Sequence, residues 1–138
     1  MDTTNEIKST LKKYPKFLPE GFYTATLEGC FTRINADCLD QIFLQFTIPI
    51  GRIASARTLY RSYARNHPTL YKEIGALVDF SIETSDDLAF ALIYLQANPG
   101  TEVDLEISPY CGDDFFLYHS IIRSVHPPGT LPRNCLKD

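Results

Sequence analysis

Alternating hydrophobic and polar positions predict a first β-strand over residues 21–34. One face of this strand is expected to carry four side chains, those of Tyr23, Ala25, Leu27 and Phe31. Gly29 interrupts the alternation and indicates a bulge or a tight bend. The turn residues Asn35 to Cys38 then predict a connection to a second strand.

The second strand is expected over residues 39–50, where the alternation is regular. Its inward face collects five hydrophobic side chains: Ile42, Leu44, Phe46, Ile48 and Ile50. Two further strands are expected at residues 101–107 and 115–125. In the first of these, Val103, Leu105 and Ile107 point inward, while Glu102, Asp104 and Glu106 are expected to face water.

Residues 52–65 fit two kinds of element. In a helix, Arg57, Arg61 and Arg65 fall at positions i, i+4 and i+8 and form one cationic face. In a strand, the same arginines also share a face, because they are separated by even numbers of residues. The threonine and tyrosine content and the preceding hairpin favour the strand.

Two helices are expected in the following segment. Pro68 suits a first helical turn, and residues 68–80 carry a hydrophobic stripe that includes Leu70, Ile74 and Leu77. Thr84 and Asp87 form a capping-box pattern before a second helix over residues 86–97. This second helix is apolar almost all round, so we expect it to be largely buried.

The order of elements is therefore three strands, a helical insert and two strands. This order predicts a mixed α/β (α+β) protein built on a five-stranded antiparallel OB-like barrel, with helices between strands 3 and 4. We expect a basic lead-in at residues 1–18, a single domain at 19–126 and a loose tail at 127–138. A chain of 138 residues is long enough to bury one core.

Charge is segregated along the chain, although its net value is only −4. Residues 41–72 contain no acidic residue, whereas residues 73–122 contain ten acidic residues and neither lysine nor arginine. The candidate nucleic-acid-binding residues are the cations and tyrosines of the basic stretch: Arg52, Arg57, Tyr60, Arg61, Tyr63, Arg65, Tyr71 and Lys72. Such a mixture suits a binding site for single-stranded nucleic acid, which needs cations to meet the phosphates and aromatic rings on which the bases stack. Phe22 and Phe43 are further candidate rings. In the alternative interpretation, the cations pair with the acidic half and the tyrosines border the core.

The opening residues Pro19 to Ala25 (PEGFYTA) resemble the start of many phage and mobile-element single-stranded DNA-binding proteins of the OB-fold type. The strand LDQIFLQFTI, the basic third strand and the closing hairpin are similar in layout over residues 19–126. The resemblance implies non-catalytic binding of single-stranded DNA in phage or mobile-element replication or recombination, with RNA as an alternative ligand. It implies no cofactor.

Other functions have weaker support in the sequence. Cys111, Asp113, Asp114 and His119 cluster near the last expected turn, but no known catalytic or metal motif is present, so we expect neither an enzyme nor a metal site. Cys30, Cys38, Cys111 and Cys135 form no CxxC pair, and with a polar N-terminus they suggest free thiols in the cytoplasm, away from membranes. The runner-up function is a protein-interaction module whose acidic face recruits a basic partner. An edge strand also offers a route to a homodimer.

Overall fold

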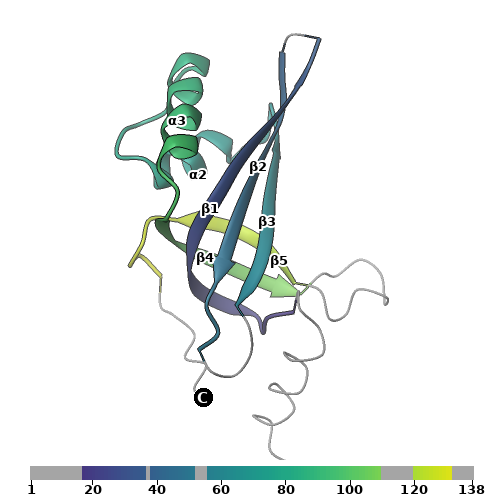
Figure 1. Cartoon of the computed structure of the whole chain (residues 1–138), viewed down its shortest axis with the longest axis vertical. Coiled ribbons are helices and arrows are strands. Elements are labelled where there is room, and N and C mark those ends of the chain that lie inside the picture. The colour runs from purple at the N-terminus through teal and green to yellow at the C-terminus, as the bar shows by residue number, and fades with distance from the viewer. Residues whose placement is uncertain (1–16, 37, 52–55, 110–119, 132–138) are drawn as a thin grey trace, which may run out of the picture.

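A computed structural model describes residues 17–36, 38–51, 56–109 and 120–131 of the chain (Figure 1). It contains five strands and two helices in these ranges: β1 (Gly21–Asn35), β2 (Cys38–Ile48), β3 (Arg57–Ala64), α2 (Leu70–Leu77), α3 (Ser85–Ala97), β4 (Thr101–Pro109) and β5 (Ser120–His126). Figure 1 shows β1, β2 and β3 as long strands that cross β4 and β5 steeply, with both helices to one side of β1.

The strands form one antiparallel sheet in the order β3-β2-β1-β4-β5. The sheet curls into a nearly closed barrel, because its two outermost strands, β3 and β5, approach each other. The predicted five-stranded OB-like barrel with helices between strands 3 and 4 is therefore confirmed. Residues 57–64 form a strand, as their β-branched and aromatic content favours.

The inward side chains of β2 and β4 make the centre of the core. The four inward β2 residues from Ile42 to Ile48 are fully buried, as are Val103, Leu105 and Ile107 of β4, and Ile50, just after β2, is 2% exposed. The chain before β1 belongs to the same core, since Leu18 is fully buried. The Leu18 amide donates to Ser120 Oγ, and Ser120 Oγ donates to the Leu18 carbonyl, each over 2.8 Å.

A bulge in β1 changes which side chains face the core. Leu27 pairs with Phe46 and Gly29 pairs with Gln45, so Glu28 is an extra residue on β1. The extra residue shifts the alternation by one position, which turns Cys30 inward and Phe31 outward. Phe31 is 52% exposed, so the prediction that it shares the inward face of Leu27 is wrong.

Helix α3 begins as predicted but is less buried than predicted. Thr84 Oγ1 accepts from the Asp87 amide, and Asp87 accepts from the Thr84 amide, which confirms the capping box. The backbone hydrogen bond from Glu83 lowers the pKa of Asp87. Leu88, Ala91, Leu92 and Leu95 are buried against the barrel, but Phe90 and Ile93 are each 65% exposed. The opposite side of this apolar helix is mostly open among the described residues, so the expectation that the helix is largely buried is wrong.

The outward side chains of β4 also differ from their expected exposure. Asp104 is 1% exposed, and its Oδ2 accepts from the Leu131 amide over 3.1 Å. Glu106 is half-buried and accepts from Ser124 Oγ over 2.9 Å, so Glu102 is the one exposed carboxylate of the three. The prediction that all three carboxylates face water is therefore wrong for Asp104. The cluster of Cys111, Asp113, Asp114 and His119 lies outside the described residues.

Candidate nucleic-acid interface

The alternation of β3 separates the predicted binding residues into two groups. Arg57, Arg61 and Tyr63 point inward, whereas Tyr60 points outward and is 57% exposed. Arg57 is 3% exposed, its Nε donates to the Phe17 carbonyl over 3.3 Å, and burial lowers the pKa of its guanidinium. Arg52 lies outside the described residues.

Arg61 spans the seam of the barrel. Its Nη1 donates to the Ile122 carbonyl of β5 over 3.0 Å, and its Nε and Nη2 donate to the two carboxylate oxygens of Glu73 over 3.1 and 3.0 Å. Burial alone would lower the pKa of Arg61, but hydrogen bonds and charge attraction from Glu73 and Tyr63 outweigh it, so the pKa is raised. The side chain of Arg61 therefore joins β3, α2 and β5.

Glu73, on α2, is the centre of this buried network. Its Oε1 accepts from the hydroxyl of the fully buried Tyr63, and its Oε2 accepts from Thr69 Oγ1 over 2.8 Å. Burial and the nearby Glu73 carboxylate raise the pKa of Tyr63. Arg61 and Glu73 form an ion pair that joins the basic stretch to the acidic half. Such pairing is what the alternative interpretation of the basic stretch predicts.

A second surface, formed by the outward side chains of β1, β2 and β3, presents exposed rings. We call it the outer sheet face and define it by four rows of paired residues: Thr26, Thr47 and Thr58; Gly29, Gln45 and Tyr60; Phe31, Phe43 and Ser62; Arg33, Gln41 and Ala64. None of these paired positions carries a carboxylate. Phe31, Phe43 and Tyr60 thus come from three neighbouring strands and share one face.

The Phe31 ring lies across Gly29. A Cβ atom placed on Gly29 would come within 2.8 Å of the Cε2 and Cζ atoms of that ring. The missing side chain therefore makes room for the ring to lie over its own strand, with much of its surface open to solvent. Phe43, directly opposite on β2, is half-buried and extends the same platform.

Two arginines lie at the end of the outer sheet face next to the β1–β2 turn, Arg33 in its last row and Arg65 beside that row. Arg33 Nη2 contacts Asp40 Oδ2 over 2.6 Å, and both side chains are exposed. Arg65 follows β3, is exposed, and lines a hollow of about 410 Å³ together with Asn35, Asp40 and Asn66. Glu28, at the bulge, is an exposed carboxylate near this face.

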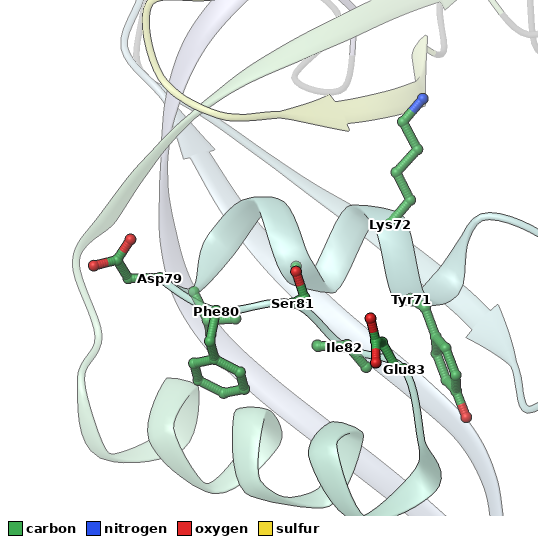
Figure 2. Close-up of a pocket in the computed structure, with 9 residues that line it drawn as sticks. Tyr71, Lys72, Asp79, Phe80, Ser81, Ile82 and Glu83 are labelled. Atoms are coloured by element: carbon green, nitrogen blue, oxygen red, sulfur yellow. The ribbon is translucent and has the colours of Figure 1, made fainter.

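Tyr71 and Lys72 lie on α2, apart from the outer sheet face. Both are exposed and border a groove formed with residues 78–83 (Figure 2). Figure 2 shows the Lys72 side chain extending away from that segment, toward the strands. Of the eight predicted residues, Tyr60 lies on the outer sheet face and Arg65 lies at its border.

Sequence reasoning missed Phe31 and Arg33 as members of the candidate interface. The signal for Phe31 was Gly29, which predicts a bulge. A bulge reverses which of the following residues face inward and outward, and the prediction for Phe31 did not include this reversal. Arg33 was not singled out because it lies outside the basic stretch of residues 41–72.

The fold and this face together define a small OB-like barrel with an open, aromatic three-stranded face. No known protein family matches the chain, and no curated protein shows significant similarity to it. Within the described ranges, no group of three or more His, Cys, Asp or Glu side chains is placed to hold a metal ion. The described helices include none that is long and apolar enough to cross a membrane.

Proposed function

We propose that this protein binds single-stranded DNA, without catalysis, through the outer sheet face. The observation that carries the proposal is the placement of Phe31, Phe43 and Tyr60 on three adjacent strands, all on the outward side. Exposed rings on a sheet are costly to leave in water and are suited to stacking with bases. Strands 2 and 3 of OB-fold barrels, the positions of β2 with Phe43 and β3 with Tyr60, are among the elements that bind oligonucleotides.

Hydrogen-bonding groups surround the rings. Gln41 and Gln45 stand beside them on β2, and three threonines form the row toward the other end of the face. Amides and hydroxyls both donate and accept hydrogen bonds, so they suit base edges of any type. A face with these groups is expected to tolerate many sequences, because stacking supplies most of the affinity.

Arg33 and Arg65 are the described cations placed to meet phosphates at the border of this face. The exposed Arg33–Asp40 pair is weakly stabilising, so exchanging Asp40 for a phosphate costs little. Arg57 and Arg61 play no part in this proposal, because their guanidinium groups serve the fold. We place this binding in the cytoplasm, in replication or recombination of a phage or mobile element, as the resemblance of residues 19–126 implies.

Fluorescence anisotropy with labelled oligo-dT tests the proposal. We expect binding of the single strand at low salt and much weaker binding of the matching duplex, because paired bases cannot stack on the rings. If Arg33 and Arg65 alone meet phosphates, the log–log salt slope should be near −1.4, at about −0.7 per phosphate contact. A slope near −3.5 would mean that about five cations take part. An oligo-U strand distinguishes RNA from DNA, and no binding at micromolar protein would refute the proposal.

Replacing Gly29 with alanine should weaken oligo-dT binding by about fivefold, which corresponds to the lower end of the about 1–3 kcal/mol of one stack. The new Cβ would force the Phe31 ring off the strand, because the two would be 2.8 Å apart. Gly75→Ala is the matched control, since a Cβ there meets only the Phe80 carbonyl oxygen at 4.0 Å. Urea unfolding should show that both variants remain folded; unchanged binding by Gly29→Ala would mean that the position of Phe31 is unimportant.

A further inference from the structure

We infer that the exposed side of α3 is a docking surface for a basic amphipathic helix of a partner protein. This surface, the α3 apolar face, consists of Phe80, Phe90, Ile93 and Tyr94. Phe90, Ile93 and Tyr94 are spaced i, i+3 and i+4, so they lie together on one side of the helix. Their exposed fractions are 65%, 65% and 46%, and Phe80 is 37% exposed.

The α3 apolar face is an assembled surface. Phe80, from the segment before α3, packs edge-on against Phe90, with ring centroids 5.8 Å apart and an interplanar angle of 66°. Figure 2 shows Phe80 directed from that segment toward α3. Phe80 also borders the groove between α2 and residues 78–83, so the apolar surface continues into a hollow. A stripe of this kind, with a hollow at one end, suits the ridge of side chains on a docked helix.

Carboxylates border the α3 apolar face. Asp86 is exposed one helical turn before Phe90, Asp79 is exposed beside Phe80, and Glu83 is exposed in the wall of the groove. No lysine or arginine occurs between residues 73 and 122, so α3 and the segment leading to it contain no cation. Lys72, on α2, extends away from residues 78–83 (Figure 2).

The combination of an apolar centre and an anionic border selects the chemistry of the partner. An amphipathic helix with aliphatic residues on one side and lysine or arginine along its flanks would cover the rings and meet the carboxylates. A second copy of this chain is a poorer occupant, because its own α3 would bring another acidic border and no lysine or arginine. The same carboxylates, with no lysine or arginine on α3 beside them, disfavour the phosphates of single-stranded DNA on this face. The surface is therefore independent of the outer sheet face.

The test uses a fluorescently labelled 18-residue synthetic peptide of leucine and lysine, with leucines at helical spacing. Two control peptides carry glutamate for lysine or the same composition in scrambled order. We expect the leucine–lysine peptide to bind the full chain at low salt and to bind more weakly as salt is raised. Phe90→Ser/Ile93→Ser should weaken this binding at least about tenfold, since two apolar anchors are removed. Tyr60→Ala should leave it unchanged, and the double variant should still bind oligo-dT, which separates the two surfaces.

Three results would overturn the inference. The first is equal binding of the scrambled or glutamate peptide, because the helical pattern and the charge would then be irrelevant. The second is unchanged peptide binding by Phe90→Ser/Ile93→Ser in a protein that remains folded by circular dichroism. The third is a wild-type dimer in sedimentation equilibrium that the double variant converts to monomer, because a second copy would then be the occupant.

Discussion

Replacing Glu73 with alanine should lower the free energy of unfolding by about 3–5 kcal/mol, the usual cost of removing one member of a buried ion pair. The change leaves the Arg61 guanidinium in the seam without its counter-charge, and it removes the acceptor of Tyr63 and Thr69. Because a domain of this size has a stability of about 5–15 kcal/mol, the variant should be close to unfolding. Urea unfolding followed by circular dichroism measures the loss.

Glu83→Ala is the matched control, because Glu83 is an exposed carboxylate of the same acidic half. It should change stability by less than about 0.5 kcal/mol. A second comparison replaces both members, as Arg61→Leu/Glu73→Leu, which removes the buried charges together and should cost less than Glu73→Ala alone. Equal stability of Glu73→Ala and wild type would show that Arg61 does not depend on this carboxylate.

Phe31→Ala and Tyr60→Ala should each reduce the affinity for oligo-dT by about 5- to 150-fold, the equivalent of about 1–3 kcal/mol for one lost stack. Both rings are more than half exposed, so their removal takes little from the core. The double variant should lose more affinity than either single variant while retaining its cooperative unfolding. Anisotropy titrations at one fixed salt concentration give the affinities.

Tyr71→Ala tests the location of the site. Tyr71 is also an exposed tyrosine of the basic stretch, but it lies on α2 rather than on the outer sheet face. It should bind oligo-dT as the wild type does. If Tyr71→Ala loses affinity and Tyr60→Ala does not, the interface is on α2 and the outer sheet face is not the binding surface.

The fold could be predicted because its strands and helices follow local patterns. Period-two alternation in β2 and β4 and the capping box of α3 each depend on residues close in sequence. The candidate interface was harder to predict. An alternating strand places arginines together without revealing which face is the core, and Arg57 and Arg61 occupy the inner one.

Burial of polar groups depends on distant partners that a local pattern does not contain. Arg61 is tolerated inside because Glu73 and the Ile122 carbonyl satisfy it, and these partners lie 12 and 61 residues away. Asp104 is covered through Leu131, 27 residues further along. The reverse holds for Phe90 and Ile93, whose apolar character predicts burial although each is 65% exposed among the described residues.

Because the Arg61 side chain closes the barrel, closure has to wait until the residues that Arg61 contacts have been synthesised. The β1–β2–β3 meander joins strands that follow one another, so its contacts are complete once residue 64 has been synthesised. Its closure by Arg61 also needs Glu73, which follows soon after β3, and Ile122, which emerges from the ribosome much later. The aromatic rings of the outer sheet face would thus be assembled on the nascent chain before the barrel beneath them is sealed.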